Sequence, residues 1–288
     1  MTPKHKGVDI ARDKWNEIRE LFDRSESEIS INRFLHHSWL SRKPYTTEKK
    51  LFKEIKRTVN QPVAVEFLDE LLSDAYLYRQ ILEPDSFKWR REEREVADSI
   101  RALNVFRVVQ PVPMMLALVR EYRNGRVTLR QTKIVFRAME NFHVQFTAVT
   151  SQRTGGGTAF MYASSARQLL DAVTNDGESV VIKKLISKLR DRVRSYEEFE
   201  AAFFEIRFTD ENTRQRQLVR YLLRRIDEHM RDGVVPDYDR MTMEHILPQK
   251  PVQQAEELEE VGIMGNLLFL DGKLNDKQVI LRQNRDSH

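Results

Sequence analysis

Cysteine is absent from the 288-residue sequence, which excludes a disulfide scaffold, a thiolate zinc site and a cysteine nucleophile. Glycine and proline are scarce, with 10 and 9 copies, so we expect long helices joined by short loops. No apolar run approaches the roughly 20 residues that a membrane-spanning helix needs. The amino-terminal segment is charged and lacks the apolar stretch of a secretory signal. We therefore expect a cytoplasmic protein with no membrane partner.

The sequence also has only a small excess of positive over negative residues. Lys plus Arg is 48 and Asp plus Glu is 44, which gives a formal net charge of +4. An excess of this size is compatible with nucleic-acid binding but does not argue for it, because the distribution of charge matters more than its sum. Hydrophobic residues, at 40%, are numerous enough to form a core, and the length suggests one large domain or two smaller ones.

Apolar residues recur at spacings of three and four, which predicts a mainly α-helical fold. The pattern changes after Asp232-Gly233, where 241–246 and the apolar run 266–270 predict two short strands, and a helix begins near Asn275. We expect a helical body over residues 1–232, a possible scaffold for DNA, and a small strand–loop–strand–helix unit over 233–288. Helices are predicted at 14–23, 27–39, 51–59, 64–78, 89–103, 113–122, 129–147, 159–173, 180–194, 196–206 and 211–230.

The segment 243–249, Met-Glu-His-Ile-Leu-Pro-Gln, holds the residues with the clearest chemistry. Glu244 and His245 place a carboxylate beside an imidazole, and Pro248 ends the strand. Strand alternation points the two side chains to opposite faces, but at a frayed strand end both can line one site. An imidazole changes protonation near neutral pH and can take a proton from water. Taken alone, a structural histidine is the more common explanation of such a residue.

Two downstream blocks, Gly265-Asn266-Leu267 and Asn275, extend this motif. A histidine on one strand, an asparagine that opens a second strand and an asparagine that opens a helix form the layout of a ββα-metal finger. The segment resembles the HNH, or His-Me finger, nucleases. More closely, the chain resembles the C-terminal half of GmrSD-like modification-dependent (type IV) restriction endonucleases and their phosphorothioate-sensing relatives, which carry Glu-His-Ile-Leu-Pro-Gln, Gly-Asn-Leu and a downstream Asn. Residues 34–39 and 50–53 extend the resemblance into the helical body.

The resemblance implies a metal-dependent DNA endonuclease of a bacterial anti-phage restriction system. His245 would be the general base that activates water, and Asn266 would position the loop of His245. Glu244 and Asn275 would bind Mg²⁺ or Mn²⁺, and Lys277 would contact phosphate. The expected substrate is modified or phage DNA. The nucleotide-hydrolysing sensing domain of such enzymes, with its Asp-Gly-Gln-Gln-Arg block, has no counterpart here and is expected as a separate domain or subunit.

Basic residues recur at helical spacing in two places, and each set predicts a positive helix face that follows a phosphate backbone. An ordinary solvated helix face explains either set equally well. The first set is Arg126, Arg130, Lys133 and Arg137, and the second is Arg216, Arg220 and Arg224.

Two alternatives to a DNA endonuclease stay open. The first is a non-catalytic helical DNA-binding or assembly module that retains the HNH-like finger as structure. The shortened last helix after Val279 and the missing sensing domain motivate it. The second is an RNA-cutting effector of the same superfamily, because the chemistry acts on a phosphodiester that DNA and RNA share.

Overall fold

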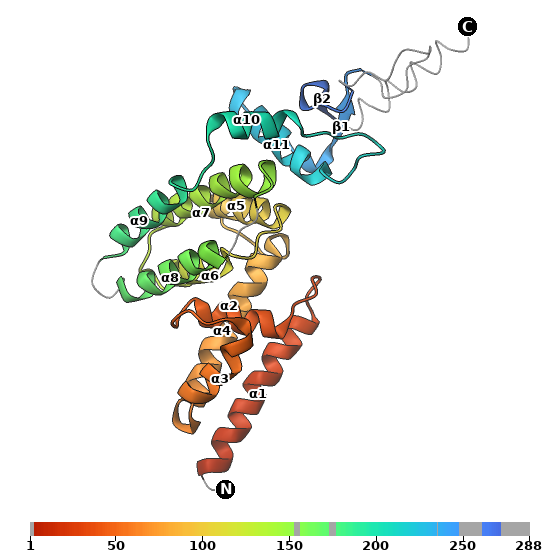
Figure 1. The fold of residues 1–288 in the computed structure, drawn as a ribbon. Coiled ribbons are helices and arrows are strands. Elements are labelled where there is room, and N and C mark those ends of the chain that lie inside the picture. Colours follow the sequence, from red (N-terminus) through yellow and green to blue (C-terminus); the bar gives the residue numbers. More distant parts are fainter. Residues whose placement is uncertain (1–2, 153–155, 173–176, 235, 248–260, 272–288) are drawn as a thin grey trace. The chain divides into compact units, whose positions relative to one another are not determined.

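The computed structural model describes residues 3–152, 156–172, 177–234, 236–247 and 261–271 (Figure 1). Within these ranges the fold is mainly helical, with one two-stranded sheet. This confirms the predicted mainly α class with a small strand pair. The helix expected near Asn275 lies outside the described residues, so the complete ββα finger stays a prediction. The chain divides into two compact units, one of residues 1–147 and 151–193, the other of residues 148–150 and 194–288.

The first unit is built from helices that overlap the predicted ones. The main difference is the first helix, which begins near the amino terminus instead of at residue 14. Short 3₁₀ turns occur at Gln61–Val63, Pro84–Ser86 and Arg91–Glu93, and a π-helical turn, Val144–Val149, follows α7. The helices are α1 (Pro3–Asp23), α2 (Ile31–Leu40), α3 (Glu48–Thr58), α4 (Ala64–Leu82), α5 (Arg94–Val105), α6 (Val112–Arg123), α7 (Leu129–His143), α8 (Gly156–Ala172) and α9 (Glu178–Arg190).

Helix α6 forms the centre of this unit. All of its residues from Val112 to Glu121 are buried. It packs against α2, α4, α7 and α8. A helix that is apolar on nearly every face can be stable only inside a protein, and a proline in its first turn costs no hydrogen bond. The apolar run of α6 thus sets where the surrounding helices lie.

A buried ionic network joins α4 to α2 and α6. Asp74 on α4 is fully buried and accepts two hydrogen bonds of 2.9 Å from Arg120 on α6. It also accepts bonds of 3.0 and 2.9 Å from Arg42 and one of 2.7 Å from Ser38. Burial lowers the pKa of Arg120, and the nearby carboxylate opposes that effect. Because each buried charge has a partner only in this arrangement, the network fixes the three helices relative to one another.

We predict that D74A lowers the free energy of unfolding by about 3–5 kcal/mol, because Arg42 and Arg120 would lose their shared counter-charge inside the protein. As a control, D85A removes an exposed partner of Arg101 and should cost no more than about 1 kcal/mol. Urea denaturation of the full chain measures both. Similar midpoints for D74A and D85A would contradict a structural role for the network.

Among its described residues, the second unit contains two helices and the sheet: α10 (Tyr196–Phe204), α11 (Arg216–Met230), β1 (Met241–His245) and β2 (Leu267–Asp271). The strands are antiparallel, with Met241 opposite Asp271 and His245 opposite Leu267. Asn266 was expected to open the second strand; it lies instead in a 3₁₀ turn, Met264–Asn266, directly before β2. A further 3₁₀ turn, Tyr238–Arg240, precedes β1.

The compact unit that holds the strands also holds α10 and α11, which the sequence analysis assigned to the helical body. The predicted division at residue 232 into a helical body and a small nuclease unit stays a prediction. In the described part of the chain, no helix combines the length and the hydropathy that crossing a bilayer requires.

Candidate active site

His245 is the last residue of β1, and the loop between α10 and α11 holds its ring. Nε2 lies 2.9 Å from the backbone oxygen of Phe208, and the two rings are stacked, with centroids 5.9 Å apart and planes inclined by 13°. A carbonyl oxygen only accepts hydrogen bonds, so Nε2 carries the proton in this contact. In the neutral ring Nδ1 is then the basic nitrogen. The side chain is half-buried, which keeps it accessible to solvent.

The loop that holds the histidine is itself fixed to the segment before β2. Phe208 N donates to Gly262 O at 2.8 Å, and Arg207 pairs with Ile263 in an isolated antiparallel bridge. A Cβ atom at Gly262 would lie 3.1 Å from the methyl group of Thr209, which is closer than side chains normally pack. The absence of a side chain at this position therefore allows the two segments to approach each other.

The Asn266 side chain joins the end of β1 to the start of β2. Its Oδ1 accepts from Leu247 N at 2.7 Å, and its Nδ2 donates to Val261 O at 2.8 Å and to Leu247 O at 3.3 Å. Ile246 N donates to the backbone oxygen of the same asparagine at 2.8 Å. Asn266 is only 5% exposed, so water cannot easily replace these bonds. The residues that follow His245 are thus held by one buried amide, which suits the positioning role that was predicted for it.

Glu244 does not share a face with His245. In the antiparallel register Glu244 lies opposite Leu268 and His245 opposite Leu267. Regular pairing reaches the end of β1, so the pleat points the two side chains to opposite faces of the sheet. The end of β1 is therefore not frayed, and Glu244 and His245 do not line one site in the way that a frayed end would have allowed.

The described residues do not by themselves form the predicted metal site. No three His, Asp or Glu side chains in the described ranges are grouped closely enough to hold an ion. Mg²⁺ needs few protein ligands when phosphate and water supply the rest, but it does need oxygen atoms on one side of the site. Asn275 and Lys277 lie outside the described residues. A site for Mg²⁺ or Mn²⁺ that uses Glu244 and Asn275 therefore stays a prediction.

The first basic set is only partly available to a ligand. Arg126 and Lys133 are each ion-paired with a glutamate of the same unit at 2.6 Å. Arg130 and Arg137 make no hydrogen bond or ion pair with the side chains that the structure describes. The DNA-binding hypothesis for this set thus rests mainly on Arg130 and Arg137.

In the second basic set, two arginines hold the sheet to α11. Arg220 donates to Met241 O at 3.0 Å and to the backbone oxygen of Tyr238, and its guanidinium lies over the Phe269 ring, 5.3 Å from the centroid. Arg224 lies over the Tyr238 ring at 5.4 Å and is paired with the glutamate one turn further along α11. Both arginines therefore have structural partners, whereas Arg216 is exposed, with no side-chain partner in the described ranges.

Sequence reasoning did not find Phe208, the residue that anchors the histidine. Its contribution to the polar contact is a backbone oxygen, and every residue has one. The Tyr238 and Phe269 rings under the two arginines were also missed, because a stripe of basic residues carries no sign of what packs against it. A lone glycine at 262 between apolar residues was the one available signal of a close approach.

We predict that N266A lowers the free energy of unfolding by about 1–3 kcal/mol, because the backbone groups of Leu247 and Val261 would lose their buried partner. The control is N212A, which removes an exposed side chain of the same unit and should change stability by less than about 0.5 kcal/mol. Urea unfolding of the full chain checks both. An N266A variant as stable as N212A would contradict the bridging role.

We predict opposite effects for two neighbouring arginines of α11. R220A should lose about 1–3 kcal/mol of stability, because it removes two hydrogen bonds and a cation–π contact. R216A should keep wild-type stability but weaken DNA binding and lower its salt dependence by about one counterion. Thermal unfolding and filter binding at several salt concentrations separate the two. Equal stabilities, or unchanged DNA binding by R216A, would contradict the assignment.

Residues 193–280 match the family model of the C-terminal domain of GmrSD restriction endonucleases. A search of curated proteins gives no match. The matched range begins beside residue 194, where the second compact unit starts, and it includes α10, α11 and both strands. His245, Asn266 and the loop that holds the histidine all fall inside it. The match confirms the predicted resemblance for this part of the chain, and residues 193–280 form a C-terminal region like that of the GmrSD restriction endonucleases.

Proposed function

We propose that the chain is a DNA endonuclease of the HNH type, acting in bacterial defence against phage, with His245 as the general base. The family of the matched domain consists of restriction endonucleases, which supports cleavage of DNA as the reaction class. Modified or phage DNA is the proposed substrate. A nucleotide-hydrolysing sensing domain or subunit is the proposed partner.

One contact carries the proposal: the 2.9 Å approach of His245 Nε2 to Phe208 O. A structural histidine also donates to backbone carbonyls, so this contact supports the proposal through the tautomer that it sets. Here the contact fixes the protonated nitrogen on the side of the protein and makes Nδ1 the basic one. The Asn266 amide then holds the chain directly after the histidine, so that the orientation of the ring is maintained.

The proton transfer follows from this arrangement. Nδ1 takes a proton from a water molecule as the water oxygen attacks the phosphorus atom of the scissile phosphodiester. The new P–O bond forms while the bond to the leaving 3′ oxygen breaks, and that oxygen takes a proton from bulk water. The proton removed from the attacking water stays on the imidazolium until solvent accepts it. The Nε2–H bond to Phe208 O keeps the second nitrogen in place throughout. A proton transfer of this kind typically contributes about 10²–10⁴-fold to the rate.

The proposal includes Mg²⁺ or Mn²⁺, which when bound would supply positive charge next to the scissile phosphate and the leaving oxygen. Glu244 and Asn275 are its proposed ligands. The sheet register turns Glu244 away from His245, and Asn275 lies outside the described residues. The proton transfer from water to Nδ1 of His245 does not depend on the exact position of the ion.

We predict that the full chain nicks DNA when Mg²⁺ or Mn²⁺ is present, and that H245A lowers the single-turnover rate by about 10²–10⁴-fold. The substrates are plasmid DNA and phage DNA that carries modified bases. Added imidazole should restore part of the rate to H245A, because it supplies a base where the side chain is missing. H245Q, which can still donate toward Phe208 O, should be as inactive as H245A.

The matched control is H229A, which removes an exposed histidine of α11 from the same unit. H229A should cut at the wild-type rate. Thermal unfolding of each variant shows whether a lost activity reflects lost structure. Equal cutting by the wild type and H245A, in either metal, would contradict the proposal.

The non-catalytic alternative has one observation in its favour, which is the separation of Glu244 from His245 on the sheet. It predicts salt-sensitive DNA binding without cleavage in any metal. The same assay with single-stranded RNA tests the other alternative, an RNA-cutting effector. If the chain cuts RNA in preference to DNA and H245A does not, His245 is still the general base but the substrate is RNA.

A further inference from the structure

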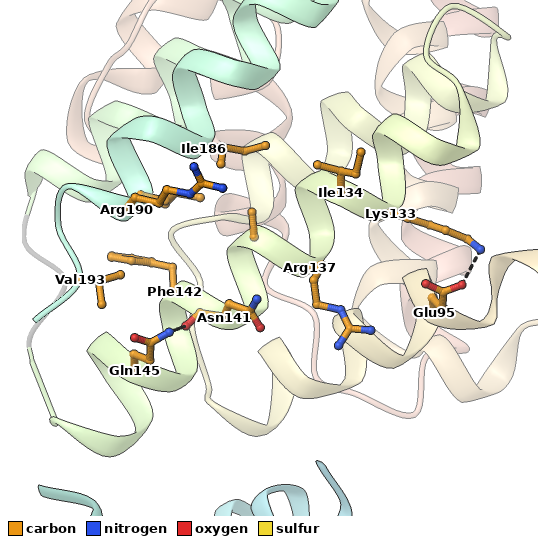
Figure 2. Close-up of a pocket in the computed structure, with 12 residues that line it drawn as sticks. Glu95, Lys133, Ile134, Arg137, Asn141, Phe142, Gln145, Ile186, Arg190 and Val193 are labelled. Carbon is orange, nitrogen blue, oxygen red and sulfur yellow. Dashed lines mark hydrogen bonds and ion pairs between the residues drawn. The ribbon is translucent and has the colours of Figure 1, made fainter. Parts of the chain in front are cut away.

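A pocket of about 540 Å³ lies in the first unit between α7 and α9, with α5 at one end (Figure 2). It is distant in sequence from the candidate active site, and none of its residues belongs to the unit that holds His245. Pockets of a few hundred cubic ångströms are the usual size for small organic ligands. The residues that matter to its chemistry are Ile134, Arg137 and Asn141 of α7, Ile186 and Arg190 of α9, and Val193 just after α9.

The pocket has two positive charges that no described residue neutralises. Lys133 at its edge is paired with Glu95 at 2.6 Å, and Glu95 is the one acidic residue among those that line the pocket. Arg137 and Arg190 make no ion pair or side-chain hydrogen bond with any described residue. Figure 2 shows them on facing helices around the same space. An arginine without a counter-charge among the described residues favours an anion beside it, and Arg is well suited to bind phosphate.

The rest of the pocket wall suits the face and edge of a base. Ile134, Ile186 and Val193 give it an aliphatic side, and Ile134 is 45% exposed although it is apolar. The Asn141 side chain, one turn after Arg137, has no partner among the described residues, so its amide offers both a donor and an acceptor. An apolar surface next to a free amide and a cationic end matches a ligand that has a flat apolar body, a polar edge and a phosphate.

We propose that this pocket between α7 and α9 binds a nucleotide, with its phosphate at Arg137 and Arg190, its base against the aliphatic wall and its base edge at Asn141. The ligand is either a free mononucleotide or one unstacked nucleotide of a single strand, since both present the same groups. An acidic peptide would satisfy the two arginines but would not explain why the apolar wall and the free amide stand beside them. The proposal gives Arg137, a member of the first basic set, a pocket that it shares with Arg190, and it places a nucleotide contact in the unit that does not hold His245.

The test is a binding measurement on the full chain by fluorescence anisotropy, with a short fluorescein-labelled oligothymidylate as the probe. We expect R137A/R190A to weaken binding by about tenfold or more, because two charge-assisted contacts to phosphate are lost. The control is R19A/R94A, which removes the same charge from two exposed arginines outside the pocket and should weaken binding less than about twofold. I134D, which adds a carboxylate at an exposed position of the wall, should also abolish binding and should leave the fold intact.

Competition by unlabelled dTMP identifies the source of the ligand. Displacement by dTMP, but not by the same concentration of inorganic phosphate, means that the free nucleotide occupies the pocket. Binding of the strand that dTMP fails to displace, but that R137A/R190A loses, means that a nucleotide within a strand does. Either result supports the proposal. Equal binding by R137A/R190A and R19A/R94A, whether both bind or both fail, would overturn it.

The H245A variant separates this proposal from the nuclease proposal. It should bind the oligothymidylate as the wild type does, because the pocket residues are unchanged. Loss of cutting by H245A with unchanged binding by R137A/R190A would leave the nuclease in place and reject the pocket. If the chain cuts no DNA but binds the oligothymidylate through Arg137 and Arg190, the pocket proposal stands and the nuclease proposal is rejected.

Discussion

The three side-chain hydrogen bonds of Asn266 are the interaction on which the candidate site depends. They hold Leu247, two residues after His245, and Val261, which precedes the segment that pairs with the loop of Phe208. The amide is buried, so each bond is difficult for water to replace. Without it, the end of β1 and the start of β2 would have only their backbone pairing to keep them together. The orientation of the imidazole is therefore a property of this whole hairpin, and the histidine contributes only part of it.

Different interactions stabilise the two compact units. The first has a fully buried helix, α6, and a buried ionic network around Asp74, so its helices are fixed by burial and by charges that cannot be left unpaired. In the described part of the second, the two strands contain one buried residue, Leu267. Arg220 and Arg224 compensate by covering the Phe269 and Tyr238 rings and by donating to the backbone at the start of β1. Arg220 and Arg224 thus have structural partners in this unit, and the DNA contact predicted for their set stays a prediction.

The sequence was sufficient for the helical class, the two strands and the resemblance of the C-terminal region, because each of these follows from local pattern or from a short motif. The His-Ile-Leu-Pro and Gly-Asn-Leu blocks led to His245 and Asn266, which the fold brings together. The sequence was not sufficient for the partner of the histidine, since the backbone oxygen of Phe208 has no residue type to mark it. Nor could it decide the direction of Glu244, which depends on how far the strand pairing extends. Arg137 and Arg190, which have no counter-charge among the described residues, come from different helices and line one pocket only through tertiary packing.

The proposed catalysis depends on one feature of the histidine at the end of β1, which donates through Nε2 and is basic at Nδ1. A two-bond ¹⁵N–¹H correlation spectrum of the imidazole rings, with the His245 signals assigned by their loss in a variant, measures this directly. At a pH where the ring is neutral, the account predicts the tautomer with its proton on Nε2. A ring protonated on Nδ1 under the same conditions would contradict it, because the nitrogen assigned to accept a proton from water would already carry one.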